Sequence, residues 1–146
     1  MKISTRARYG LRFMIELAAD YGRKPVYLKN IAGSQEIPEK YLGQIAISLK
    51  SAGLIDGFRG VHGGYILARP PSDINLKEIV SVLEGDLSLI ECLRTPGSCQ
   101  RASECVSREV WQKLGDVISE TLEAITLETL AAKSREKLQK EVMYHI

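Results

Sequence analysis

Three cysteines with soft-ligand chemistry lie close together in the sequence, at Cys92, Cys99 and Cys105. Six residues separate the first two, and five separate the last two. Thiolates are common ligands of iron–sulfur clusters and of zinc. Both histidines, His62 and His145, lie outside this segment, so a zinc ion would lack a local fourth ligand. The spacing therefore favours an iron–sulfur cluster with an unusual fourth ligand.

The same thiols have two other interpretations, which the sequence leaves open. Arg94, Arg101 and Arg108 lie among them, and nearby positive charge lowers the pKa of a thiol, as a redox switch requires. The cysteines can also be inert side chains. An odd number of cysteines in a chain with no visible secretory signal argues against a structural disulfide framework.

A second set of polar residues follows a helical pattern that opens at Pro38, since proline suits the first turn of a helix. Gly53 can end this helix in a left-handed conformation. Its apolar residues recur at helical spacing and form one stripe: Tyr41, Leu42, Ile45, Leu49 and Ala52. We expect the helix to present several side chains to DNA base edges, where glutamine bonds adenine and glutamate accepts from cytosine. These candidates are Glu39, Lys40, Tyr41, Gln44 and Ser48.

A glycine-rich segment between two short apolar runs follows the helix, and such glycines allow the backbone of a tight β-hairpin. A helix and a basic hairpin together are typical of a winged helix-turn-helix. The helix fills a major groove, and the hairpin follows the backbone or enters the minor groove. The candidate DNA contacts of the hairpin are Arg59, Val61, His62 and Gly63. Winged helices also serve as protein-interaction modules, so that alternative stays open.

The segments before this helix complete a DNA-binding module. Ser4 or Thr5 can cap a first helix that runs to about Tyr21, and residues 27–36 read as a short second helix. Arginines crowd the start of the first helix, against the preference of the helix dipole for acids, and a phosphate partner would remove that conflict. Solvated arginines are the alternative. On the first interpretation, Ser4 and Arg6 are added to the candidate DNA contacts.

The carboxyl-terminal half has a different character. Asn75 and Glu78 form the pattern of a capping box that begins a connecting helix. After the cysteines, apolar residues repeat at spacings of three and four, and a twin helix would bury such a long stripe. A helix buried in its own monomer is the alternative. The candidate dimer contacts are Trp111, Leu114, Ile118, Leu122 and Ile125, and Thr126 can cap a short final helix through Ala131.

These patterns predict a mainly α-helical fold with a small β-wing, in which a winged helix-turn-helix precedes a long dimerisation helix. The expected parts are a DNA-binding domain (1–70), a connecting helix (71–91), a cysteine loop (92–105) and the dimerisation and carboxyl-terminal helices (106–146).

Charge and composition agree with a nucleic-acid partner. Residues 1–70 contain 11 Lys and Arg against 5 Asp and Glu, whereas residues 71–146 contain 9 against 13. A basic amino-terminal half fits a polyanion, and an acidic carboxyl-terminal half indicates another role. No apolar run is long enough for a membrane span, and no signal peptide is visible, so we expect a cytoplasmic protein. The sequence has no Cys-x-x-Cys pair, nucleotide loop or catalytic His/Asp set, which argues against a thiol-dependent oxidoreductase or other enzyme.

Three stretches resemble the Rrf2 family of bacterial regulators: MKISTRARYGLRFMIELA, YLGQIAISLKSAGLIDGFRGVHGGYILA and CLRTPGSCQRASECVSREVW. The resemblance covers essentially the whole chain and implies a homodimer that represses operons through a palindromic operator. In the IscR-like, cluster-binding branch it implies that Cys92, Cys99 and Cys105 hold an iron–sulfur cluster, with [2Fe–2S] favoured over [4Fe–4S]. The opening and the MYHI ending look closer to the CymR-like branch, which is cluster-free and senses through a partner enzyme.

The chain departs from the family at the positions that supply the fourth ligand. The IscR-like position, three residues after the last cysteine, holds Arg108, and the NsrR-like position in the first helix holds Arg8. Neither side chain can coordinate iron. Gly43 stands where some IscR proteins carry a glutamate that discriminates between operators, so the operator is expected to differ. The remaining candidates for the fourth ligand are an external thiol or Glu91, Glu104, Ser107 or Glu109.

We therefore expect a dimeric transcription factor, a repressor of genes for iron–sulfur cluster biogenesis or for cysteine and sulfur metabolism, that senses through a cysteine-ligated cluster. The rival hypotheses are a cluster-free regulator controlled by a partner protein or by thiol oxidation, and a pure protein-interaction module.

Overall fold

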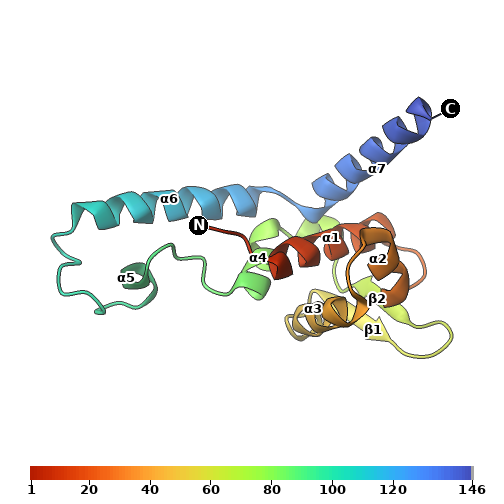
Figure 1. Ribbon diagram of the computed structural model, residues 1–146, viewed down its shortest axis with the longest axis horizontal. Coiled ribbons are helices and arrows are strands. Elements are labelled where there is room, and N and C mark those ends of the chain that lie inside the picture. Colours follow the sequence, from red (N-terminus) through yellow and green to blue (C-terminus); the bar gives the residue numbers. More distant parts are fainter. Residues whose placement is uncertain (146) are drawn as a thin grey trace.

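The computed structural model describes residues 1–145, which form helices and one small antiparallel sheet (Figure 1). The predicted mainly α-helical fold with a β-wing is confirmed. The elements are α1 (Thr5–Ala19), α2 (Leu28–Gln35), α3 (Glu39–Ser51), β1 (Ile55–Phe58), β2 (Gly64–Leu67), the 3-10 turn η1 (Pro71–Asp73), α4 (Leu76–Glu84), α5 (Glu91–Arg94), α6 (Val106–Ala124) and α7 (Leu127–Tyr144).

Helix α1 is the centre of the N-terminal lobe, as residues 1–70 are called below. Its N-cap is Ser4, whose hydroxyl accepts a hydrogen bond from the backbone N–H of Ala7 at 3.0 Å, so the predicted cap is confirmed. The expected end at Tyr21 is wrong, because the helix ends at Ala19 and Gly22 then takes a positive φ of 84°. Tyr21 is consequently 47% exposed. The apolar face of α1 is buried at Phe13, Met14, Leu17 and Ala18.

Helices α2 and α3 form the helix-turn-helix. Glu36 takes a left-handed conformation (φ 54°) after α2, Ile37 is buried, and Pro38 is the N-cap of α3. The predicted stripe of α3 is buried at Leu42, Ile45 and Leu49. Its expected last member is wrong: Ala52 is the C-cap and is exposed, because Gly53 turns the chain away with a φ of 75°.

The predicted hairpin is present as β1 and β2, which pair from Ile55–Leu67 to Phe58–Gly64. Val26 adds a single antiparallel bridge to Tyr65, with backbone hydrogen bonds of 3.0 and 2.8 Å. Gly64 lies next to this bridge at a φ of 125°, where an added Cβ would come within 2.6 Å of the Val26 carbonyl oxygen. A residue with a side chain does not fit there.

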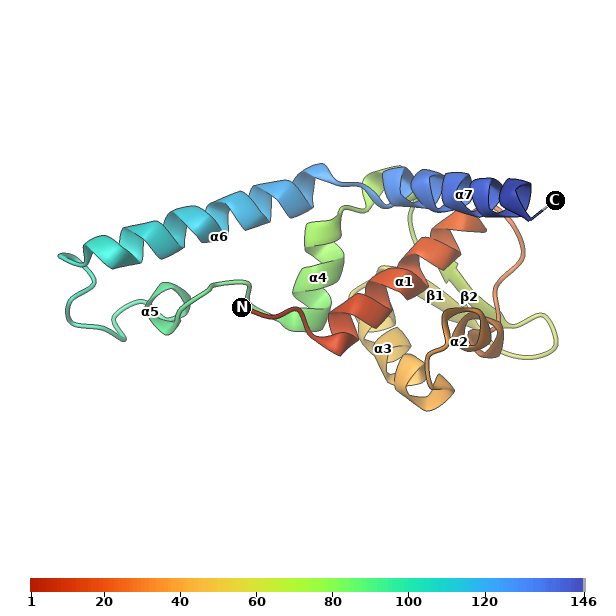
Figure 2. The same ribbon diagram turned by 45° about the horizontal axis from the view of Figure 1, so that its top comes forward.

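The predicted capping box of α4 is confirmed, and Gly85 ends the helix as expected. Helix α4 packs closely on α1, because a Cβ at Gly10 would lie only 2.1 Å from Leu83 Cδ1. Figure 2 shows α4 descending from the α6–α7 junction beside α1, while α7 runs across α1. The two buried residues of α7, Leu127 and Ala131, join the same hydrophobic core.

Two other sequence expectations for the carboxyl-terminal half are corrected. The expected loop 92–105 contains part of a short helical turn, α5. The final helix does not stop at Ala131 but runs to Tyr144. Residues 132–144 contain no glycine or proline, so helix propensity extends the helix through a solvated segment. Within residues 1–145, no helix combines the length and apolar character of a membrane span.

Candidate nucleic-acid interface and cysteine loop

The outer face of α3 carries the solvent-exposed side chains of the candidate interface. Glu39, Lys40 and Gln44 are exposed, as an interface with base edges requires. Ile47 lies on the same face and is 66% exposed. Sequence reasoning missed Ile47, because an apolar residue in a helix is ordinarily assigned to the core. An exposed aliphatic side chain between polar ones suits contact with a thymine methyl group.

The other two candidates on α3 are partly engaged within the protein. Tyr41 is half-buried, and its ring packs edge-on against Tyr9 with 5.9 Å between ring centroids. Ser48 accepts a hydrogen bond from the Arg6 guanidinium. This contact joins the start of α1 to α3, so the predicted residue Arg6 lies beside the face of α3. Ser4 is half-buried as the cap of α1.

The hairpin projects from the N-terminal lobe with an open tip. Arg59, Val61 and His62 are exposed, with Val61 at 83%, whereas the fourth candidate, Gly63, is buried. The Tyr27 hydroxyl donates a hydrogen bond to the Val61 carbonyl oxygen and ties the tip to the start of α2. Sequence reasoning also missed Tyr27, which no local pattern relates to a residue 34 positions away.

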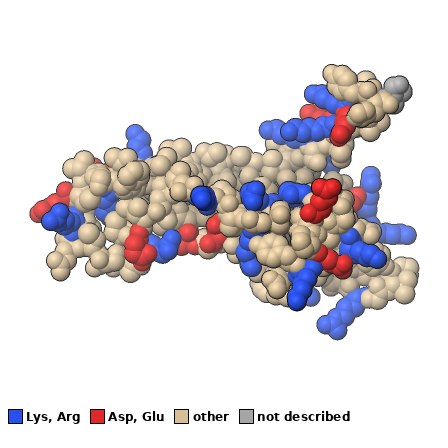
Figure 3. Space-filling view, viewed as in Figure 1, with Lys and Arg blue, Asp and Glu red and all other residues tan. Residues whose placement is uncertain are grey.

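A groove of about 390 Å³ lies between the hairpin and the helices, with lining residues that include Tyr27, Lys50, Phe58 and Arg59. Lys and Arg side chains project from the lobe that holds α1–α3 and the hairpin (Figure 3). The structure therefore brings the basic residues of the hairpin, the exposed face of α3 and the start of α1 together on one lobe.

The cysteine loop (residues 92–105) begins within α5 and ends at Cys105, just before α6. Cys92 and Cys105 are half-buried, Cys99 is exposed, and all three are free thiols. Arg94 anchors the start of the loop, with its Nε 3.9 Å from Asp86 Oδ2 and its Nη1 3.6 Å from Glu91 Oε2. Hydrogen bonds from Ser88, then the charge of Arg94, lower the pKa of Asp86. These contacts hold α5 close to the end of α4.

Cys105 is the N-cap of α6, and its Sγ lies 3.3 Å from Ser107 Oγ. This hydrogen bond lowers the pKa of the Cys105 thiol, with smaller contributions from the backbone and charge of Arg108. A lowered pKa increases the fraction of thiolate, the form that binds metals and reacts with oxidants.

The donor set fits an iron–sulfur cluster in chemistry but is not assembled in the single chain. Three thiols supply ligands of the right type. Within residues 1–145, however, no three His, Cys, Asp or Glu side chains are grouped so that they could hold a metal ion. Arg108 Nε is buried without a hydrogen-bond partner among these residues.

Helix α6 presents the candidate dimer face without burying any of its own residues. Trp111 is 41% exposed and Leu114 is also exposed, whereas the later members of the stripe are half-buried: Ile118, Leu122 and Ile125. In Figure 1, α6 extends well away from the N-terminal lobe.

An exposed helix of a helix-turn-helix and a projecting β-hairpin on the same basic lobe define a winged-helix protein of the DNA-binding class. The chain belongs to the Rrf2 family of transcriptional regulators, whose family model, described as an iron-dependent transcriptional regulator, matches residues 3–133.

Three comparisons illustrate the relationship. The HTH-type transcriptional regulator CymR of Bacillus subtilis (strain 168) is 40% identical over 146 residues, which cover 100% of both chains. The structure of CymR, the global cysteine regulator of B. subtilis, matches with a TM-score of 0.78 and 41% identity over 91% of this chain and 98% of that one. The structure of T. potens IscR matches with a TM-score of 0.74 and 40% identity over 95% and 91%. The relatives are regulators, so the prediction that the chain is not an enzyme is confirmed.

Proposed function

We propose that the chain is a cytoplasmic, dimeric repressor that binds a pseudo-palindromic operator. The observation that carries the proposal is the open face of α3 beside the exposed hairpin tip on a basic lobe. In a dimer, the two copies of α3 would enter successive major grooves about 34–36 Å apart. Glu39, Lys40, Gln44 and Ile47 would contact base edges, and Arg59 would hold a phosphate or enter the minor groove.

The exposed stripe of α6 supports the dimer. Trp111 and Leu114 are large apolar side chains that no part of the described chain covers fully. A second copy of α6 packed along the stripe would remove them from water, and the hydrophobic effect would stabilise the pair.

The cysteine loop is the proposed sensing element. Cys92, Cys99 and Cys105 would hold an iron–sulfur cluster, [2Fe–2S] in preference to [4Fe–4S]. The fourth ligand would be an external thiol or an oxygen of a nearby acid or serine, since Arg108 cannot coordinate. When bound, the cluster supplies reversible redox chemistry. Cys92 lies on α5 and Cys105 caps α6, so bringing these thiols together would fix the start of α6 relative to α4.

The proposed genes under control are those of cysteine and sulfur metabolism or of iron–sulfur cluster biogenesis. The similarity to a global cysteine regulator and to an IscR protein supports this assignment. The test is operator affinity for cluster-loaded, cluster-free and Cys→Ala forms at one fixed salt concentration. We expect the loaded form to differ from the other two, and equal affinities for all three forms would exclude control by a cluster.

A cluster-free sensor is the second candidate, because Cys99 is exposed and the three thiols are not gathered in the single chain. Such a regulator would respond to thiol oxidation or to a partner protein. Protein isolated without oxygen separates the candidates: visible absorbance and acid-labile sulfide indicate a cluster, and colourless protein that still binds its operator supports the second candidate.

A further inference from the structure

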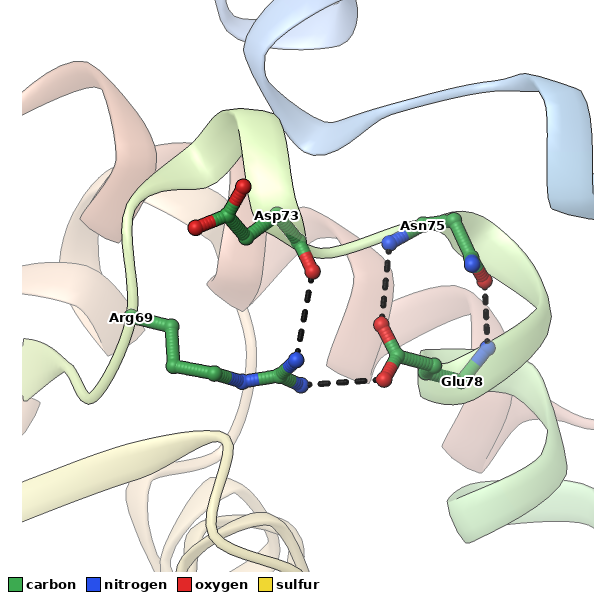
Figure 4. A network of polar contacts seen from close by, with 4 residues as sticks. All are labelled: Arg69, Asp73, Asn75 and Glu78. Carbon is green, nitrogen blue, oxygen red and sulfur yellow. Dashed lines mark hydrogen bonds and ion pairs between the residues drawn. The ribbon is translucent and has the colours of Figure 1, made fainter.

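Arg69 connects the exit of the hairpin to the start of α4, as Figure 4 shows. It lies two residues after β2, and its guanidinium spans two acceptors. Nη1 donates to the carbonyl oxygen of Asp73 at 3.2 Å, and Nη2 donates to Glu78 Oε1 at 3.0 Å. A planar guanidinium held by two acceptors has little freedom to rotate.

Glu78 is fixed on its other side by the capping box of α4. Its Oε2 accepts a hydrogen bond from the Asn75 backbone N–H at 3.1 Å, and the Glu78 backbone N–H donates to Asn75 Oδ1 at 3.0 Å. The carboxylate therefore cannot turn away from Arg69 without opening the cap. Exposed ion pairs contribute little when isolated, but pairs fixed within a network are the exception.

Residues 74–76, at the start of α4, are hydrogen-bonded to the α6–α7 junction. Leu76 donates its backbone N–H to the carbonyl oxygen of Ile125 at 2.9 Å, and Leu127 donates to that of Ile74 at 2.8 Å. These bonds flank an antiparallel bridge between residues 75 and 126. Residues 69–78 thus connect the hairpin to the end of α6.

We infer that the Arg69–Glu78 network sets the angle between the N-terminal lobe and α6, and thereby the distance between the two copies of α3 in a dimer. The inference rests on the proposed function, because it concerns a DNA-bound dimer. Arg69 and Glu78 are positioning residues that act through α4. Without their bonds, the start of α4 and the α6–α7 junction bonded to it would be held less precisely against the lobe, although α4 would stay packed on α1. The dimer would then tolerate half-sites at several spacings.

The test measures how affinity depends on half-site spacing. Its probe is the palindrome that the wild-type protein protects in DNA upstream of its own gene. One duplex carries both half-sites at the native spacing. Two others have one base pair added or removed between the half-sites, and a fourth carries a single half-site. One base pair changes the separation by about 3.4 Å and rotates it by about a tenth of a turn. The variants are Arg69→Met, which keeps the aliphatic stem, and Glu78→Gln, which keeps a capping-box residue type.

We expect both variants to bind the native spacing roughly tenfold more weakly than the wild type, which is about 1.4 kcal/mol. Their affinity for the altered spacings and for the single half-site should stay unchanged, so the spacing preference flattens. Arg135→Met, which removes the same charge from the exposed part of α7, should keep the wild-type preference.

A uniform loss on every duplex, including the single half-site, would overturn the inference, because it would mean that the network only stabilises the lobe. An unchanged spacing preference in Glu78→Gln would also overturn it, even if Arg69→Met proved too unstable to measure. If the wild-type protein protects no DNA, the proposed function fails and the inference fails with it. If the wild type protects a palindrome but both variants match it, the inference alone fails.

Discussion

At the scale of single residues, the hairpin depends on a glycine that no other residue replaces. Gly64 has a φ of 125°, and a Cβ added there would lie 2.6 Å from the Val26 carbonyl oxygen. We expect Gly64→Ala to lower the free energy of unfolding by about 2–3 kcal/mol, through backbone strain and this clash. Urea denaturation measures the change.

Gly33→Ala is the matched control for this substitution. Gly33 lies within α2, and an added Cβ meets no atom within 4 Å. Alanine there should raise stability by about 0.5–1 kcal/mol, because it is the better helix former. Equal effects at the two glycines would contradict the role assigned to Gly64.

The second prediction for a single residue concerns the contribution of Arg59 to DNA binding. Its exposed side chain at the hairpin tip should contact the DNA backbone or the minor groove. Arg59→Ala should weaken binding roughly tenfold for every sequence and reduce the slope of log affinity against log salt by about 1. Titrations of a labelled operator over a series of salt concentrations measure both quantities, and Arg135→Ala, on the exposed part of α7, should leave both unchanged.

The residues of the candidate interface were partly predictable from the sequence. Lys40, Gln44 and Arg59 stand out because polar residues off an apolar stripe have a simple interpretation. Ile47 was missed because hydrophobicity alone does not distinguish a core position from a solvated one. Tyr27 was missed because its contact with Val61 depends on how α2 and the hairpin pack, which local spacing does not encode.

At the scale of elements, α7 combines an anchored start with a solvated remainder. Leu127 and Ala131 are buried, whereas no described residue after Ala131 is. Deleting residues 134–146 should therefore change Tm by no more than about 3 °C, as surface changes in small domains do. Leu127→Ala should instead cost about 2–5 kcal/mol. Thermal unfolding of the two proteins makes the comparison, and a large loss on truncation would contradict it.

The helices whose ends are marked by capping or terminating residues were predicted well, and the helix without such residues at its end was not. A capping hydroxyl begins α1, and a capping box and Gly85 bound α4, so the sequence predicts those limits closely. The solvated part of α7 has neither a buried stripe nor a terminating glycine or proline to mark its end. Its extent follows from helix propensity, a weak signal that is easily underestimated.

At the scale of the whole molecule, the α6 stripe predicts the oligomeric state. Leu114→Asp places a carboxylate on the apolar face, so dimerisation should weaken by roughly 30-fold or more, equivalent to about 2 kcal/mol. Sedimentation over a range of concentrations measures the shift from dimer to monomer. Lys113→Asp is the control, because Lys113 is exposed and helical geometry of about 100° per residue places it off the stripe. A wild-type monomer at all concentrations would contradict the prediction.

The assembly and the arrangement of the thiols lie beyond what the sequence predicts. Spacing identifies three potential ligands, but the distances between them depend on how residues 92–105 fold around α5. The stripe of α6 indicates that another surface covers it, and we propose that this surface belongs to a second copy of the chain. Neither determines the angle between α6 and the N-terminal lobe, which depends on contacts such as Arg69 with Glu78.

The position of the amino-terminal residues has a practical consequence for protein production. The Ser4 backbone N–H donates to Glu84 Oε1 at 2.7 Å, and Met1 lines a depression of about 400 Å³ together with Ile118 and Leu122. An affinity tag fused ahead of Met1 would emerge beside the surface through which two copies are proposed to meet. Purification handles therefore belong after α7, whose Tyr144 is 88% exposed.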